Sequence, residues 1–336
     1  MLVLEFVKKR TRRWMLSLAL STLFLIVLTI CSLCIGSTDI YSPHKAVSLL
    51  LQGDPIAQYR LERSVLAILT GSALSLAGFL MQVATRNPLA DPFLLGVSGG
   101  ALTFALLSIL VFRTISLALS TSLAFVGAMT VYGITTVLAS IGGYSASALV
   151  LAGISMSMLF SAISYILLYV LALKIGVPIV FYLMGSLSLA SSSDVMPYVT
   201  ALTASLALSL SMWKRINVLI VSDEYSMQLG YNPKTTRLAI TAIASFITSV
   251  SVSIVGIVGF IGLIAPHVAR FMVGSDSRIA IPMSVIVGSI LTLSGDIVIR
   301  ILSASTYLGE LPLGVVTSLM GAPALCAIAM KRLRSL

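Results

Sequence analysis

Residues 86–100 read Arg86-Asn87-Pro88-Leu89-Ala90-Asp91-Pro92-Phe93-Leu94-Leu95-Gly96-Val97-Ser98-Gly99-Gly100, and this polar segment separates two long apolar runs. A proline disfavours helix at the residue before it, so Asn87 and Asp91 are expected in extended or turn conformations. Asp91 can then cap a helix that begins at Pro92. The segment therefore predicts a sharp turn, after which the chain re-enters the membrane.

The whole chain has the composition of a polytopic membrane protein. Of its 336 residues, 58% are hydrophobic and only 10% are charged, and the mean hydropathy is +1.08. A water-soluble fold cannot cover so much apolar surface. Because a spanning helix needs about 20 residues, we expect a single all-α transmembrane domain with about ten spans. The expected spans are residues 15–36, 62–84, 93–112, 115–140, 147–172, 194–213, 238–258, a short 260–273, 280–302 and 312–330.

Basic residues predict that both termini lie in the cytoplasm. The tails 1–14 and 331–336 each carry a cluster of lysines and arginines, and most of the 21 Lys and Arg fall on the cytoplasmic side of a ten-span topology. The apolar run after the first tail is too long for the core of a signal peptide. The net charge of +10 is therefore mainly a topology signal, and it is a poor indication of nucleic-acid binding.

The longest polar interruption, residues 214–237, predicts a short amphipathic helix at the inner surface. Ser222 can cap this helix, and Gly230 can end it. Asp223 and Glu224 fit its first turn, where the helix dipole favours negative charge. The alternative is a mere connector, although a connector needs fewer residues.

Charges near the outer face need an explanation. Asp296 and Arg300 are four residues apart, so they share a helix face and can pair. Alternatively, they reach water from the end of the span. Arg60, Glu62 and Arg63 open the second span. Three arginines at this face call for an anionic partner, because guanidinium groups bind carboxylates in bidentate geometry. That partner is a lipid or an extracytoplasmic protein.

Small residues recur in the spans, and close helix packing explains them better than pore lining. In the second span they are Gly71, Ser72, Ala73, Ser75, Ala77 and Gly78.

No motif predicts catalysis or nucleotide binding. The sequence contains no G-x-x-x-x-G-K-[ST], and residues 96–100 lack the lysine of a phosphate-binding loop. If ATP drives this protein, another chain must hydrolyse it. The two histidines lie outside any cluster of potential ligands, and Cys31 and Cys34 lie within an apolar run. We therefore expect no metal site, no cofactor and no enzymatic activity of its own.

Several segments together resemble the permease subunits of ABC importers for iron-siderophores, haem and vitamin B12. They are residues 60–63, 71–82, 86–92, 95–98 and 259–270, Gly295-Asp296 with Arg300, residues 310–317 and residues 321–323. Their order and spacing cover nearly the whole chain. The resemblance implies ten helices in each subunit, a permease dimer, two cytoplasmic ATP-binding subunits and an extracytoplasmic substrate-binding protein. It places the protein in the cell membrane.

The resemblance also implies roles for individual residues. Arg60, Arg63 and Arg300 are similar to the arginines that dock glutamates of the binding protein. The family usually has proline between the paired arginines, where this chain has Glu62. The residues similar to the cytoplasmic gate are Asn87 and Leu89, with Ser145 and Ser147 from the turn between the fourth and fifth spans. Those similar to the helix that contacts the ATPase are Ser222, Asp223, Glu224, Leu229 and Gly230.

The cargo stays open at this point. Ferric siderophore is favoured by its frequency in the family, and haem and cobalamin are the alternatives. A proton-coupled secondary transporter is a rival from another class, but it needs titratable carboxylates near the membrane centre, and Asp296 is the only candidate. A membrane enzyme would need a cluster of His, Asp or Glu, and none is apparent.

Overall fold

The computed structural model describes residues 2–36, 39–113, 116–175, 185–188, 191–306 and 311–333, with side chains except at 2–10, 175, 305–306 and 324–333. The described residues form helices and connecting segments, with one isolated β-bridge between Ile35 and Ile40. The helices are α1 (Leu2–Cys34), α2 (Pro43–Leu51), α3 (Pro55–Thr85), η1 (Pro92–Leu95), α4 (Val97–Phe112), α5 (Leu117–Ile141), α6 (Ala146–Ile175), α8 (Ser192–Ser211), α9 (Trp213–Val221), α10 (Asp223–Gln228), α11 (Pro233–Val255), α12 (Ile261–Val273), α13 (Ser277–Thr306) and α14 (Leu313–Leu333). The prediction of an all-α membrane fold is confirmed.

Each of the ten expected apolar runs coincides with a helix. Within the described residues, six helices are long and apolar enough to cross a membrane, and α8 with α9 makes a seventh candidate that is bent by 63°. The remaining three are the shorter apolar helices α4, α12 and the described apolar part of α14. Of the predicted cytoplasmic tails, residues 1 and 334–336 lie outside the described residues.

Two helices begin at other residues than the expected spans do. α3 begins at Pro55, seven residues before the expected span, because Asp54 Oδ1 accepts a hydrogen bond from Ala57 N at 2.9 Å and Pro55 suits the first turn. Asp91 does cap at Pro92, but only the short 3₁₀ turn η1. Gly96 then takes a φ of 79°, so α4 starts at Val97.

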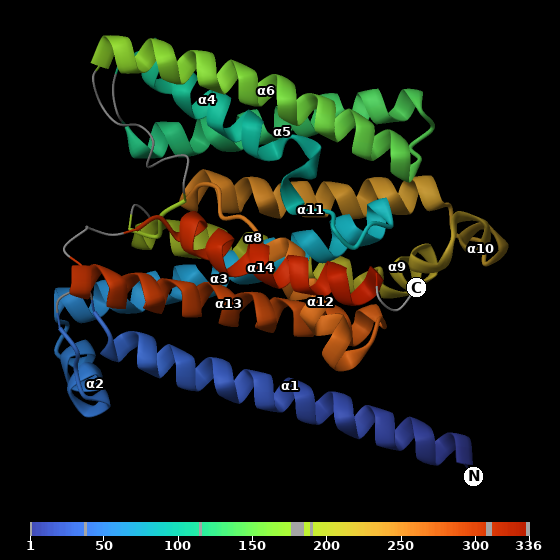
Figure 1. The fold of residues 1–336 in the computed structure, drawn as a ribbon, viewed down its shortest axis with the longest axis horizontal. Coiled ribbons are helices and arrows are strands. Elements are labelled where there is room, and N and C mark those ends of the chain that lie inside the picture. Colours follow the sequence, from blue (N-terminus) through green and yellow to red (C-terminus); the bar gives the residue numbers. More distant parts are fainter. Residues whose placement is uncertain are drawn as a thin grey trace.

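α3 is the central helix of the molecule, packed against α11, α12 and α13 (Figure 1). Its small residues allow close approach, as predicted. A Cβ at Gly78 would lie 1.8 Å from the carbonyl oxygen of Gly262 in α12. A Cβ at Gly71 would lie 2.2 Å from that of Gly288 in α13. These contacts fix the spacing of the three helices.

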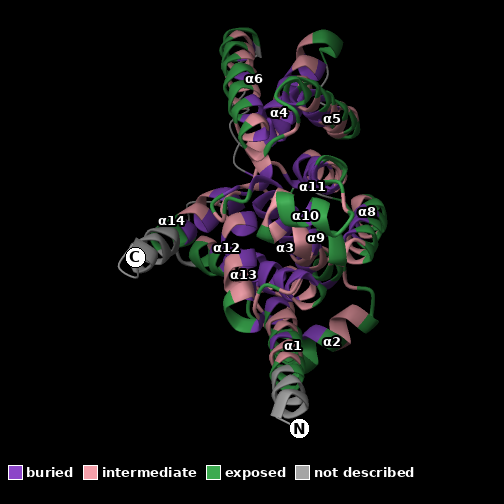
Figure 2. Ribbon diagram, turned by 90° about the vertical axis from the view of Figure 1, so that its right-hand side faces the viewer, coloured by how far each residue is buried: buried purple, intermediate pink, exposed green. Residues whose placement is uncertain are grey.

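Helices α4, α5 and α6 form a group beside this core (Figures 1 and 2). The group is joined to the core through α11, which packs against α5 and α4, and through η1, which packs against α6. Gly153 of α6 lies so close to Leu94 of η1 that a Cβ would meet its carbonyl oxygen at 2.3 Å. The segment after Asp91 therefore ties the two groups together.

The polar connections lie at opposite ends of the helices. The N-terminal end of α1, the C-terminal end of α14 and the helices α9 and α10 share one end, and α2 lies at the other (Figure 1). We call these the tail end and the α2 end. α1 is peripheral and packs mainly on α13.

Candidate functional site

A short helix projects at the tail end, where the sequence predicts one from Ser222 to Gly230. α10 spans Asp223–Gln228, and the hydroxyl of Ser222 accepts a hydrogen bond from Tyr225 N at 2.9 Å. Leu229 forms the C-cap, and Gly230 follows with a φ of 78° that favours glycine. Residues 214–221 of the predicted loop are also helical, as part of α9 (Trp213–Val221), which the sequence interpretation missed.

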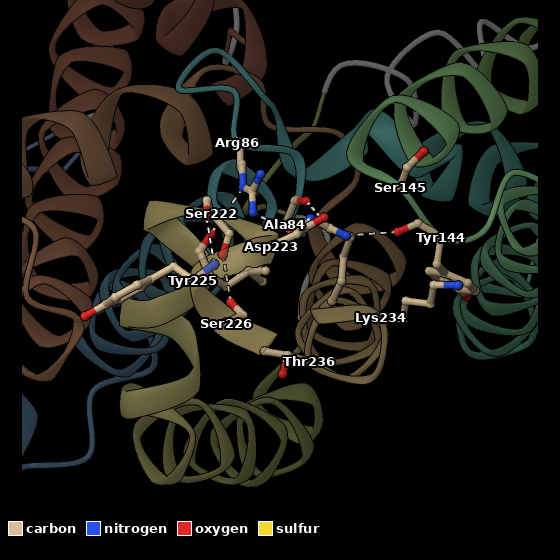
Figure 3. Close-up of polar contacts among 12 residues, drawn as sticks. Ala84, Arg86, Tyr144, Ser145, Ser222, Asp223, Tyr225, Ser226, Lys234 and Thr236 are labelled. Atoms are coloured by element: carbon tan, nitrogen blue, oxygen red, sulfur yellow. Dashed lines mark hydrogen bonds and ion pairs between the residues drawn. The ribbon is translucent and has the colours of Figure 1, made fainter. Parts of the chain in front are cut away.

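The first residue of α10 joins two arginines from other elements. The carboxylate of Asp223 pairs with Arg86 and with Arg237, whose Nη2 lies 2.8 Å from Oδ1 (Figure 3). Arg86 is the C-cap of α3 and also donates from Nε to Leu219 O at 3.2 Å. Its backbone is left-handed, with a φ of 50°. The carboxylate thus connects α10 to the end of α3.

Arg237 is the buried centre of this junction. Its side chain is 1% exposed. Besides Asp223, it donates from Nε to Ala84 O at 2.8 Å and from Nη1 to Tyr144 O at 3.0 Å (Figure 3). Ala84 belongs to the last turn of α3, and Tyr144 to the turn between α5 and α6. One guanidinium therefore holds three separate segments.

The four residues that resemble a gate lie in the two segments held by this junction. Asn87 and Leu89 follow Arg86, and Asn87 Oδ1 accepts a hydrogen bond from Leu89 N at 3.0 Å. Ser145 follows Tyr144, and its hydroxyl accepts from Ala148 N at 3.1 Å. All four side chains, including that of Ser147, are exposed.

A cavity of about 190 Å³ opens beside the junction, between the ends of α3, α9 and α12. It is lined by Gln82, Val83, Arg86, Pro88, Ile220, Arg270 and Ser275. Arg270 donates a hydrogen bond to Gln82 Oε1 across its wall. Two arginines, Arg86 and Arg270, thus line a cavity whose remaining wall is largely apolar.

Carboxyl groups around these loops differ in their proton affinity. Burial raises the pKa of Asp91 to about 6, although its Oδ1 accepts a hydrogen bond from Phe93 N at 2.8 Å. Hydrogen bonds from its own backbone N–H and from the Ser222 hydroxyl lower the pKa of Glu224. Arg278 lowers the pKa of Asp276 through a hydrogen bond.

At the α2 end, the three arginines that resemble docking residues are buried. Asp296 is fully buried and pairs with both Arg63, at 2.8 Å from Nε, and Arg300, at 2.9 Å from Nε. The predicted pairing of Asp296 with Arg300 is confirmed, and the alternative that they reach water is wrong for this chain. Arg300 Nη1 also donates to Ser32 O at 2.8 Å.

Arg60 is held in the same region by backbone carbonyls. Its Nη1 lies 3.4 Å from Cys34 O and its Nη2 lies 3.2 Å from Asp39 O, while the guanidinium stacks 4.2 Å from the centre of the Tyr41 ring. Glu62 is half-buried. The structure thus brings Arg63 and Arg300 together at Asp296 and places Arg60 beside them in the next turn of α3. Glu310, part of the family-like sequence, lies outside the described residues.

The sequence interpretation missed the roles of Arg86 and Arg237, which it counted only as cytoplasmic cations. No clear signal was present, because Arg237 immediately precedes the apolar run that begins at residue 238, and basic residues are common at the cytoplasmic ends of spans. Within the described part of the chain, no group of three or more His, Cys, Asp or Glu is placed to hold a metal ion.

Comparison with known proteins decides the family. The FecCD transport family matches residues 24–331. The chain belongs to this family. It is 33% identical over 284 residues to the Fe(3+) dicitrate transport system permease protein FecC of Escherichia coli (strain K12), covering 82% of this chain and 83% of the relative. It is 32% identical over 272 residues to the cobalamin import system permease protein BtuC of Halobacterium salinarum, covering 80% of this chain and 71% of the relative.

A solved structure supports the same assignment. A metal-chelate type ABC transporter in an inward-facing conformation matches with a TM-score of 0.81 at 29% identity, covering 95% of this chain and 99% of that one. This FecCD chain is therefore a multi-pass membrane permease of the ABC importer family for iron chelates, siderophores, haem and vitamin B12. It is a transport subunit and not itself an enzyme. The predicted resemblance is confirmed.

Proposed function

We propose that the chain is the membrane subunit of an ATP-driven importer of a ferric siderophore. The family match over residues 24–331 carries this proposal. The iron cargo is supported by the similarity to the ferric dicitrate permease and to the metal-chelate type transporter. Cobalamin and haem are the alternative cargoes, because relatives of nearly equal identity are named for them.

In this proposal two copies of the chain form the pathway, and two ATP-binding subunits bind at the tail end. That end faces the cytoplasm of a cell whose plasma or inner membrane holds the protein. α10 contacts the ATP-binding subunit, in agreement with its projection from the molecule and with the exposed side chains of Tyr225, Met227 and Leu229. The residues Asn87, Leu89, Ser145 and Ser147 form the proposed gate loops.

A substrate-binding protein docks at the α2 end. Arg63 and Arg300 share one buried carboxylate, Asp296, and Arg60 contacts backbone carbonyls, so glutamates of a partner can supply further carboxylates to these arginines. The guanidinium groups are engaged within the chain, so docking requires them to share or exchange their partners. Arg60→Glu tests the role most cleanly, because its guanidinium contacts backbone carbonyls and an aromatic ring. We expect weaker capture of the binding protein, and unchanged capture would contradict the docking role.

Uptake measurements test the function. Cells with and without the gene are supplied with labelled ferric siderophore, haem or cobalamin, each with an uncoupler or with ATP depletion. Uptake that requires the gene and ATP but survives the uncoupler supports the importer and names its cargo. Uptake abolished by the uncoupler at constant ATP would instead support a proton-coupled transporter. In that class Asp296 would have to carry protons, yet its carboxylate is engaged by two guanidinium groups.

A further inference from the structure

We propose that Asp223 is the positioning residue through which movement of α10 reaches both gate loops. This inference rests on the proposed contact between α10 and an ATP-binding subunit. It adds the path inside this chain: from Asp223 through Arg86 to the loop of Asn87 and Leu89, and through Arg237 to the loop of Ser145 and Ser147.

The first step is the attachment of α10 to the rest of the chain. This helix has six residues, and most of its side chains are exposed. The bonds of Ser222 to Tyr225 N and to the Ser226 hydroxyl lie within the helix itself. By contrast, Asp223 pairs with two residues outside the helix: Arg86, 137 residues away in the sequence, and Arg237, 14 residues away. Asp223 is therefore a polar anchor between α10 and the membrane helices.

The second step is the rigidity of Arg237. Three of its nitrogens have separate acceptors at 2.8, 3.0 and 2.8 Å: Ala84 O, Tyr144 O and Asp223 Oδ1. The guanidinium is planar, so these acceptors keep a fixed relation to one another. A displacement of Asp223 must therefore move Tyr144 and the end of α3 with it, or break the bonds.

The third step is the second arginine. Arg86 immediately precedes Asn87, and its left-handed backbone is a conformation that non-glycine residues keep only when their surroundings hold it. Its side chain is held by Asp223 and by Leu219 O of α9. The same carboxylate thus controls the loop that follows α3.

The arrangement makes a selective variant possible. In Asp223→Asn, Arg237 keeps both carbonyl acceptors and Arg86 keeps Leu219 O. The buried guanidinium stays hydrogen-bonded, so the fold should persist, while the two ion pairs at Oδ1 are reduced to weaker hydrogen bonds to a neutral amide oxygen. Arg86→Gln cuts only the branch to α3. The matched control is Asp276→Asn, which removes an ion-paired carboxylate at the same end from the connection between α12 and α13.

The test uses the permease assembled with its ATP-binding subunits in nanodiscs, in a background without the three native cysteines. Ser147→Cys reports the state of the gate loop through its rate of reaction with a water-soluble thiol reagent, with and without trapped nucleotide. Coupling between sites in proteins amounts to about 5- to 150-fold, so we expect nucleotide to change the labelling rate at least about fivefold. In Asp223→Asn this nucleotide-dependent change in labelling rate should fall below about twofold, while the ATP-binding subunits still co-purify. The change in Arg86→Gln should lie between those of the parent and Asp223→Asn. Asp276→Asn should respond as the parent does.

The outcomes separate the two levels of the proposal. If nucleotide changes labelling equally in the parent and in Asp223→Asn, Asp223 is not the link, although the importer function stands. If nucleotide changes nothing even in the parent, the path and the proposed coupling to ATP both fail. Asp223→Glu gives a further check, because it keeps a carboxylate at this position. It should recover part of the response to nucleotide, which would not happen if the variants had simply lost their fold.

Discussion

Replacing Asp296 with asparagine should destabilise the chain strongly. The side chain is fully buried and binds Arg63 and Arg300 at once. Removing one partner of a buried ion pair costs about 3–5 kcal/mol, because the remaining charge is left buried. Arg300 keeps the carbonyl oxygens of Ser32 and Ile35, and asparagine keeps one acceptor. We therefore expect a loss of about 3 kcal/mol, the lower end of that range.

Unfolding by SDS in mixed micelles, followed by circular dichroism, measures this loss. Asp276→Asn is the control, since it breaks an ion pair whose arginine is 53% exposed. Such a surface pair contributes about 0–1 kcal/mol. The reasoning would be refuted if Asp296→Asn cost less than about 1 kcal/mol or no more than the control.

Three further predictions follow from single side chains. Gly78→Ala should destabilise by at least about 2 kcal/mol in the same assay, because its Cβ would overlap the backbone of Gly262, whereas Gly133→Ala, with open space around it, should not. Asp91→Asn should stabilise by up to about 3 kcal/mol at pH 7.5. This gain in stability should shrink as the pH falls from about 6 towards 3.8, because the carboxyl group of Asp91 in the folded chain then takes up its proton. A gain that does not depend on pH would contradict the raised pKa of Asp91. Ser222→Ala removes the cap of α10, worth about 1 kcal/mol, and should speed hydrogen exchange in α10 about fivefold, while Ser222→Asn should not.

Features that depend on neighbours in sequence could be predicted. Hydropathy located the ten apolar runs, since each helix carries its own signal. The cap at Ser222 and the left-handed Gly230 also depend on a few adjacent residues. The start of α3 was missed although Asp54-Pro55 is a local signal, because the hydropathy criterion gave too much weight to Arg60 and Arg63.

Features that depend on distant residues could not be predicted from one sequence. Arg63 and Asp296 are 233 residues apart, and Arg237 and Ala84 are 153 apart. Only the packing of α3 against α11 and α13 brings these groups together. The sequence indicated three arginines that need an anionic partner, but not that a carboxylate of the same chain already binds two of them.

The two ends of the molecule each contain a carboxylate that is paired with two arginines, but the two carboxylates differ in burial. In each, one carboxylate binds two arginines from different elements, but Asp296 is fully buried and Asp223 is 29% exposed. Water can replace the partly exposed contact between Asp223 and Arg86 at small cost, and Arg237 keeps its two carbonyl acceptors. Breaking the buried contacts of Asp296, by contrast, costs more unless a partner replaces them. The α2 end is therefore built to keep α1, α3 and α13 together. The partly exposed ion pairs at the tail end agree with the proposal that this end moves and that the proposed gate loops move with it.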